Sequence, residues 1–182
     1  MIVLLTGASH TGKTKLAQRL LERKGWPYLS LDHLKMGLIR SGQTHLTPLQ
    51  DEALTGYLWP ILREMIKTVL ENGQHLIIEG CYIPFNWKND FTPSEQAQIR
   101  YCCLIFSAHY IQTHFDTILR YANAIERRQY PAHCKIEDLQ ADNAQNLQLC
   151  KAYGLPYLLI DQCYDVAPAL EQLRQDLPAI DK

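Results

Sequence analysis

An eight-residue segment near the amino terminus, residues 7–14 (GASHTGKT), matches the pattern G-x-x-x-x-G-K-[ST] at every position. It directly follows a short apolar run, residues 2–5, and leads into residues 13–21, where Leu and Ala recur at helical spacing. The order predicts a strand, a turn and a helix. In such a unit, backbone N–H groups and a helix N-terminus converge on an anion. The segment therefore predicts an α/β fold built around a phosphate-binding loop.

The residue types in this loop suit that task. Gly7 and Gly12 permit backbone angles and a close approach that a Cβ atom would block. Lys13 would place a point charge on the β- and γ-phosphates, and the Thr14 hydroxyl would bind Mg²⁺. The alternative is a chance glycine turn before a helix. The predicted nucleotide-binding residues of the loop are Gly7, Ala8, Ser9, His10, Thr11, Gly12, Lys13 and Thr14.

Composition limits what else the chain can be. Its 182 residues suit one α/β domain, and 47% hydrophobic with 20% charged residues is ordinary for a globular protein. A formal net charge of −1 gives no general basic field for nucleic acid or an anionic membrane. No apolar run could span a bilayer, and a strand that starts at residue 2 leaves no room for a secretory signal. We expect one domain over residues 1–182, in the cytoplasm.

Six cysteines raise the question of disulfides or zinc. No C-x-x-C pair occurs, so we expect free and mostly buried thiols. Cys102 and Cys103 are neighbours in an apolar run and, in a strand, would point to opposite faces. His133-Cys134 and the pair His109 and His114 lack the spacing of a metal site.

Strand and helix signals alternate along the chain. Continuous apolar strands separated by helices predict a parallel sheet covered on both faces, which is a three-layer sandwich. Ligands in such folds bind at the carboxyl ends of the strands. The expected strands are residues 2–5, 28–31, 75–80, 99–106 and 156–160, and helical segments lie at 33–40, 47–73 and 166–177. A long, mostly helical stretch, interrupted at Tyr130-Pro131, separates the last two strands.

The second and third helices carry boundary signals. Asp32 would cap a helix that starts at His33. Thr47, with Pro48 at the first helical position and Gln50 at the capping-box position, predicts the start of the next helix. Pro60 lies inside that helix and should kink or split it.

These features resemble the nucleotide- and metabolite-kinase branch of the P-loop proteins. The resemblance rests on residues 7–14, on Asp32 after the second strand, and on the arginines before the last strand. That branch includes adenylate, shikimate and gluconate kinases, chloramphenicol phosphotransferase and zeta-toxin-like kinases. The segment 76–80 (LIIEG) also resembles a stretch of 2-phosphoglycerate kinases. The resemblance implies five strands in the order 2-3-1-4-5, ATP and Mg²⁺ as cofactors, and a helical lid within about 107–138.

Phosphoryl transfer requires alignment of donor and acceptor and positive charge at the moving group. Lys13 is therefore a candidate catalytic residue, and Asp32 is the candidate base, since related kinases that act on alcohols carry an Asp there. Glu79 would hold Mg²⁺ through water or act as the base itself. Its other interpretation is a salt-bridged residue at the rim of the sheet. Planar guanidinium groups suit phosphate oxygens, so Arg127 and Arg128 are candidate catalytic residues and Arg120 a candidate nucleotide-binding residue, against the alternative of a solvated helical face.

The acceptor is open at this stage. Lys35 and Arg40 share a helix face with Asp32, and Tyr57, Trp59, Tyr82 and Trp87 are candidates for stacking on a base or sugar. Few arginines lie between residues 32 and 90, which favours a small-molecule alcohol over a nucleoside monophosphate. A polynucleotide-end kinase would need a basic surface, and the lack of one in this chain argues against that function. A nucleotide-binding switch with little catalysis is the alternative from another class. Oligomeric state is not predicted.

Overall fold

The computed structural model describes residues 1–121 and 135–175. Its centre is a parallel sheet of five strands in the order β2-β3-β1-β4-β5. This confirms the expected α/β architecture and strand order. The strands are β1 (Ile2–Gly7), β2 (Tyr28–Ser30), β3 (Leu76–Glu79), β4 (Ile99–Phe106) and β5 (Tyr157–Ile160).

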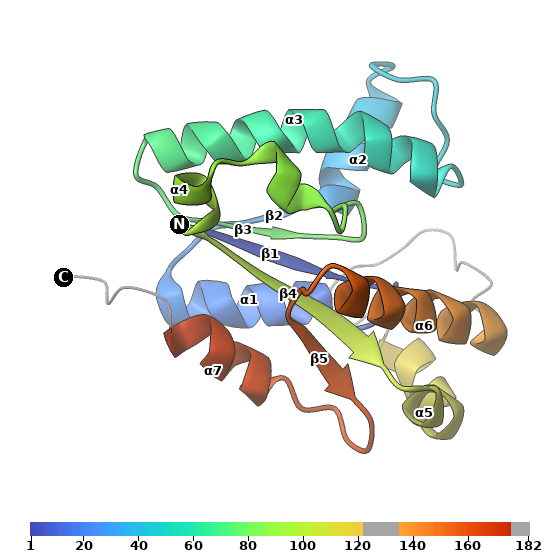
Figure 1. The fold of residues 1–182 in the computed structure, drawn as a ribbon. Coiled ribbons are helices and arrows are strands. Elements are labelled where there is room, and N and C mark those ends of the chain that lie inside the picture. The colour runs from blue at the N-terminus through green and yellow to red at the C-terminus, as the bar shows by residue number, and fades with distance from the viewer. Residues whose placement is uncertain (122–134, 176–182) are drawn as a thin grey trace.

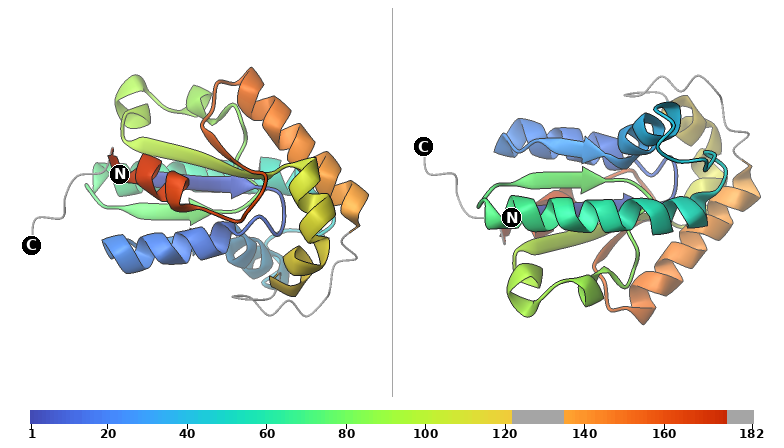
Figure 2. Two further views of the ribbon diagram at one scale, coloured as in Figure 1. Left: turned by 90° about the horizontal axis from the view of Figure 1, so that it is seen from below. Right: turned by 90° about the horizontal axis from the view of Figure 1, so that it is seen from above.

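Helices cover both faces of the sheet. Figure 1 shows α3 (Asp51–Glu71) along one face, with α1 (Lys13–Lys24) and α7 (Ala167–Gln175) on the other. Two further helices, α5 (Ala108–Tyr121) and α6 (Ile136–Ala152), pack against each other, and α6 also contacts β4. The views in Figure 2 show the same layers from below and above.

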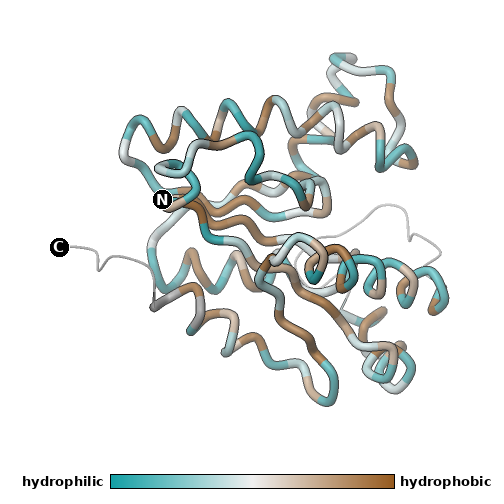
Figure 3. Tube along the Cα trace, in the orientation of Figure 1, coloured by the Kyte–Doolittle hydropathy of each residue, from teal (hydrophilic) through white to brown (hydrophobic). Residues whose placement is uncertain are grey.

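The core consists of two hydrophobic clusters, one on each face of the sheet. Along β1 the residues alternate: Val3 and Leu5 face the side of α1, whereas Ile2 and Leu4 face the side of α3. Cys102 and Cys103 are likewise buried in different clusters, as the period of a strand requires. Figure 3 shows the apolar residues concentrated along the strands. All the cysteines that the structure describes are free.

Two helix boundaries differ from the predictions. Helix α2 (Leu31–Arg40) begins two residues before His33. Helix α3 begins at Asp51, and the Gln50 side chain instead closes a preceding turn by accepting hydrogen bonds from Thr47. The capping-box contact therefore forms, but four residues outside the helix. Helix α3 continues through Pro60, so the predicted split is wrong.

The connection between β3 and β4 contains two short elements that the sequence analysis did not predict. They are a 3₁₀ helix, η1 (Trp87–Asp90), and a one-turn helix, α4 (Pro93–Gln96). A capping box fixes α4: Thr92 accepts a hydrogen bond from the Glu95 N–H, and the Glu95 carboxylate accepts one from the Thr92 N–H. Trp87 is 2% exposed and stacks on Tyr101 of β4. This connection therefore covers the amino ends of the strands.

Candidate active site

The loop between β1 and α1 has the backbone of an anion-binding turn. Gly7, His10 and Gly12 have φ angles of 138°, 67° and 85°. Helix α1 starts at Lys13, directly after Gly12, with no side chain capping its free N–H groups. Successive residues of this kind turn their N–H groups toward one concave side. Left-handed backbone at His10, which is not glycine, is strained and is typical of functional turns.

Both glycines of the pattern have backbone angles that favour glycine, and at Gly7 a backbone contact requires it as well. A Cβ atom at Gly7 would overlap the carbonyl oxygen of Leu104 on β4. A Cβ atom at Gly12 would overlap the phenol oxygen of Tyr164, which follows β5. The loop is therefore held between the central strands and the segment after the last strand.

The polar side chains of the loop point across it. The Lys13 ammonium donates a hydrogen bond to the Ala8 carbonyl oxygen at 2.8 Å, and the buried Thr11 hydroxyl donates to the same oxygen at 2.8 Å. Lys13 thus lies over the loop. A nucleotide phosphate there would meet one full positive charge and the N-terminus of α1.

Glu79 lies next to the loop. It ends β3, pairs in register with Leu5 of β1, and is 3% exposed. The Thr14 hydroxyl donates a hydrogen bond to Glu79 Oε1 at 3.3 Å. A hydroxyl and a carboxylate are hard oxygen ligands of the kind Mg²⁺ takes beside phosphates and water. Within residues 1–121 and 135–175, no group of three His, Cys, Asp or Glu side chains could hold a metal ion, so a cation here would depend on phosphate oxygens.

Asp32 lies in the first turn of α2, next to the end of β2. The residue that caps this helix is Ser30, so the interpretation of Asp32 as a cap at His33 is wrong. Instead, Asp32 Oδ1 accepts a hydrogen bond from the Lys35 ammonium at 2.7 Å, and the Asp32 side chain is 34% exposed. Its carboxylate is therefore partly accessible and lies beside a positive charge.

Lys35 belongs to a polar chain that sequence analysis recognised only in part. The Lys35 ammonium also donates to the Tyr82 hydroxyl at 2.8 Å, and that hydroxyl donates to Asp51 Oδ1 at 2.9 Å. Burial raises the pKa of Tyr82, so it stays protonated. The sequence analysis does not identify Asp51 as a candidate residue. Its position near the start of the predicted third helix is the one feature that could have drawn attention to it. The sequence alone does not show that this position lies close to residue 82.

Cys81 follows the end of β3 by two residues. Burial raises the pKa of its thiol, and the charges of Lys13 and Lys35 act against those of Asp32 and Asp51 on the same sulfur. Lys13 and Thr14 follow the end of β1, Asp32 follows the end of β2, and Glu79 ends β3, so all four lie at the carboxyl edge of the sheet. Their roles stay predictions.

Of the three predicted arginines, Arg120 lies within the described residues. Arg120 is exposed in the last turn of α5. Its neighbour Tyr121 lies near α1, because the Lys15 ammonium is 5.9 Å from the Tyr121 ring and 5.4 Å from the Tyr164 ring. The end of α5 is therefore close to the nucleotide loop. Arg127 and Arg128 lie outside the described residues.

The other acceptor candidates have different surroundings. Trp59 donates to Asp90 Oδ2 at 2.8 Å, and Tyr57 donates to the Gln43 carbonyl at 2.9 Å. Trp87 belongs to the core. Arg63 is paired with Glu64 and Asp90, and Arg40 is exposed at the last turn of α2. Of the four aromatic candidates, Tyr82 is the one in contact with Lys35.

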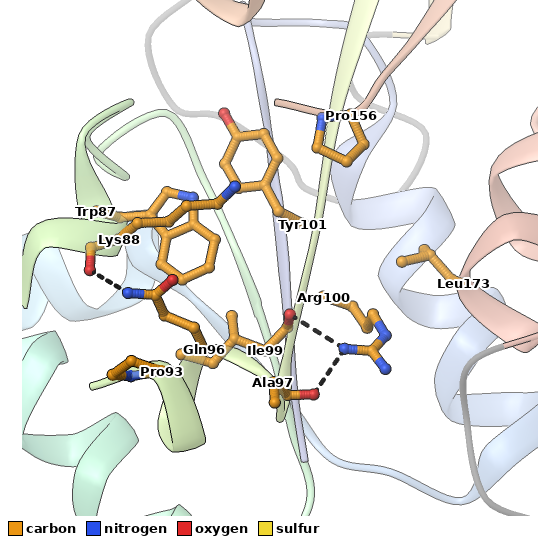
Figure 4. Close-up of a pocket in the computed structure, with 10 residues that line it drawn as sticks. All are labelled: Trp87, Lys88, Pro93, Gln96, Ala97, Ile99, Arg100, Tyr101, Pro156 and Leu173. Atoms are coloured by element: carbon orange, nitrogen blue, oxygen red, sulfur yellow. Dashed lines mark hydrogen bonds between the residues drawn. The ribbon is translucent and has the colours of Figure 1, made fainter. Parts of the chain in front are cut away.

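A pocket of about 340 Å³ lies at the opposite edge of the sheet, between η1, α4 and the starts of β4 and β5. Figure 4 shows Trp87, Tyr101 and Pro156 around it, with Arg100 donating to the Ala97 carbonyl. None of the predicted nucleotide-binding residues lines it.

Comparisons with known proteins agree with this fold. The family described as "AAA domain" matches residues 2–145, which includes the loop, Asp32 and Glu79. A sugar kinase from Janibacter sp. HTCC2649 has a TM-score of 0.56 at 16% identity, covering 96% of this chain and 92% of that one. Deoxyadenosine kinase from M. mycoides has a TM-score of 0.56 at 13% identity, covering 96% and 97%.

A gluconokinase from Sinorhizobium meliloti 1021 has a TM-score of 0.50 at 11% identity, with 96% of this chain and 89% of that chain covered. At these identities the likeness concerns the fold, and it confirms the expected resemblance to the P-loop kinases. No curated protein matched the sequence. Among the described helices, none has the length and apolar content needed to cross a membrane.

Proposed function

This chain belongs to the AAA domain family, and we propose that it is a phosphotransferase that uses ATP and Mg²⁺ to phosphorylate a hydroxyl group of a small molecule. The observation that carries the proposal is the grouping at the carboxyl edge of the sheet. Lys13 crosses the anion-binding loop, and the Thr14 hydroxyl contacts Glu79. The Asp32 carboxylate is accessible at the end of β2, which is separated from β1 by β3. This grouping supports a phosphate site, a cation site and a base that lie side by side.

The proposed roles follow from charge and position. The N–H groups of residues 8–13 and the N-terminus of α1 bind the phosphates, and Lys13 neutralises charge on the β- and γ-phosphates. Thr14 would hold Mg²⁺ directly and Glu79 would hold it through water, because Glu79 already accepts the Thr14 hydrogen bond. Bound ATP would supply the phosphoryl group. Asp32 orients the acceptor hydroxyl and takes its proton as the oxygen bonds to the γ-phosphorus, while the bond from that phosphorus to the β,γ-bridging oxygen breaks and ADP leaves.

We further propose that residues 107–138 act as a lid and that their arginines contact the phosphates. Among the described residues this proposal is supported by Arg120, because Tyr121 beside it lies near Lys15 of α1. Arg127 and Arg128 remain proposed catalytic residues outside the described ranges. Hydrogen exchange with and without an ATP analogue and Mg²⁺ tests the lid: α5 should gain protection, and equal exchange would contradict it.

The neighbours named above act on different acceptors, which keeps a nucleoside monophosphate or a polynucleotide end as the runner-up substrate. A nucleotide-binding switch with little catalysis is the other alternative. The accessible Asp32 carboxylate favours catalysis over a switch, since a pure switch needs no base there. The proposed place of action is the cytoplasm, where ATP is available.

The variant Asp32→Asn tests the proposal. Its amide cannot accept the hydroxyl proton, so transfer to an accepted alcohol should fall by about 10²–10⁴-fold. Binding of an ATP analogue should persist, because Asp32 belongs to α2 and not to the loop of residues 7–14. Coupled ADP release measures the first effect and calorimetry the second, with the exposed Glu71→Gln as matched control. Unchanged turnover in Asp32→Asn would remove the base assignment, and transfer to no alcohol by wild-type protein would favour the switch.

A further inference from the structure

Ser30 carries a hydroxyl group that the folded chain leaves without a partner. The residue is 3% exposed, and in the described part of the chain no group forms a hydrogen bond with Ser30 Oγ. Ser30 is the N-cap residue of α2, where a serine hydroxyl ordinarily accepts a hydrogen bond from the first turn, but this hydroxyl makes no capping contact. A buried polar atom of this kind is unfavourable unless water or a ligand satisfies it.

The register of the sheet places this hydroxyl on the side of the proposed cation site. Ser30 ends β2 and is paired in register with Glu79, which ends β3, so both side chains project to the same face. Two residues earlier on these strands, Tyr28 and Ile77 pack in the hydrophobic cluster on the α1 side. Because side chains alternate along a strand, Ser30 and Glu79 project to the α1 side as well. The Thr14 hydroxyl, in the first turn of α1, contacts Glu79 there.

We propose that Ser30 is a positioning residue of the cation site, and that its hydroxyl and Glu79 together hold the water through which this carboxylate would reach Mg²⁺. The inference rests on the proposed function, because it needs a cation beside Thr14. A buried water is stable where several polar partners surround it, and Ser30 Oγ, a Glu79 oxygen and the cation would supply them. The register fixes Ser30 beside Glu79 whatever else that carboxylate contacts.

The proposal gives the hydroxyl different effects in the protein without ligands and in the loaded protein. In EDTA and without nucleotide, the unpartnered hydroxyl is a cost, so Ser30→Ala should unfold at the same urea concentration as wild type or at a higher one. Ser107 supplies the matched control. It directly precedes α5, and its hydroxyl accepts a hydrogen bond from the Tyr110 N–H at 2.9 Å. Ser107→Ala should therefore lower the urea midpoint, as the loss of a structural serine does.

Binding of Mn²⁺ to the complex with ADP measures the loaded state without a need for any acceptor. Mn²⁺ stands in for Mg²⁺, and electron paramagnetic resonance counts the free ion while protein is kept in excess over ADP. The dissociation constant of Mn²⁺ should rise by about tenfold in Ser30→Ala, the order expected for loss of an outer ligand. Ser30→Cys, which keeps the shape but has a weak donor, should show a similar rise. Ser107→Ala should show none, and ADP affinity in EDTA should stay unchanged in all three variants.

The inference is overturned if Ser30→Ala unfolds at lower urea than wild type, because the hydroxyl would then have a structural partner. Equal Mn²⁺ affinity of Ser30→Ala and wild type, or a loss that Ser107→Ala shares, would overturn it as well. Wild-type protein that binds no ADP, or binds ADP but no Mn²⁺, contradicts the proposed function and this inference with it. Normal binding of both by wild type, with no effect of Ser30→Ala on Mn²⁺, contradicts the role of Ser30 alone.

Discussion

The two edges of the sheet differ in what they hold. At the carboxyl edge lie the strained loop of residues 7–14, Glu79 and the chain from Asp32 to Asp51. At the amino edge lies a pocket of about 340 Å³ with Trp87 stacked on Tyr101. This pocket is lined by aromatic and aliphatic groups together with Lys88, Gln96 and Arg100, and none of the candidate catalytic residues lines it.

The difference between the two edges shows which structural features accompany the candidate site in this fold. Strained backbone, a helix N-terminus and ion pairs collect where parallel strands end, because the loops there are free of the sheet's hydrogen bonding. At the amino edge, the connection between β3 and β4 is folded into η1 and α4, and its side chains complete the core. We therefore expect substitutions at the carboxyl edge to change catalysis and those at the amino edge to change stability.

The largest effect should follow from removing the charge over the loop. Lys13→Ala should lower phosphoryl transfer by about 10³-fold or more, since a preorganised charge at the moving group is lost. The matched control is Lys88→Ala, a lysine of the amino edge that lines the pocket. Coupled ADP release measures both. Equal activity of Lys13→Ala and wild type would remove the loop from the mechanism.

A large loss of stability should follow from Trp87→Ala at the other edge. The indole is fully buried against Tyr101 and Phe91, and removal of a buried Trp typically costs about 3–5 kcal/mol. Urea unfolding measures the change. The proposed activity of the folded fraction should stay near that of wild type, so a variant with intact stability and lost turnover would contradict the division between the edges.

A smaller effect should come from the cation site. Glu79→Gln keeps the shape of the side chain but removes its charge beside Thr14. The Mg²⁺ concentration for half-maximal activity should rise by about 10–100-fold, the usual cost of losing an outer-sphere carboxylate. The exposed Glu22→Gln serves as control. An unchanged Mg²⁺ requirement would leave Glu79 with the role of a structural partner to Thr14.

The smallest effect should come from the cap of α4. Hydrogen bonds from the Thr92 backbone and side chain hold the pKa of Glu95 below its ordinary value. The ionised form is thus favoured by folding, and its stabilisation is present above the unfolded pKa and lost as pH falls through the lower, folded pKa. Glu95→Ala should cost about 1 kcal/mol at pH 7, and the gap to wild type should narrow below about pH 4. Unfolding curves at several pH values that show a constant gap would contradict this.

Several features could be read from local sequence because the determining forces are local. The pattern of residues 7–14 predicts a strand before it and a helix after it, and the structure has β1 and α1 at these places. Gly25 ends α1 as a C-cap with left-handed backbone angles. The apolar run of residues 99–106 is β4 with the same bounds. The resemblance to known kinases supplied the strand order, which spacing alone did not.

Other features escaped sequence reasoning because distant contacts decide them. Pro60 stays inside a continuous α3, whose Leu58 and Leu62 are fully buried against the sheet. Packing of this face outweighs the lost hydrogen bond at the proline. Similarly, Lys35 pairs with Asp32 within one helix turn, but its bond to Tyr82 joins residues 47 positions apart.

By itself, the sequence determined the phosphate loop, the layered sheet and the two acidic positions at strand ends, because glycine geometry and apolar periodicity act over a few residues. Only the tertiary structure decided that Tyr82 would bridge Lys35 and Asp51, and that Tyr164 would lie against Gly12. Those contacts depend on where β3, α3 and the segment after β5 come together once the sheet is assembled.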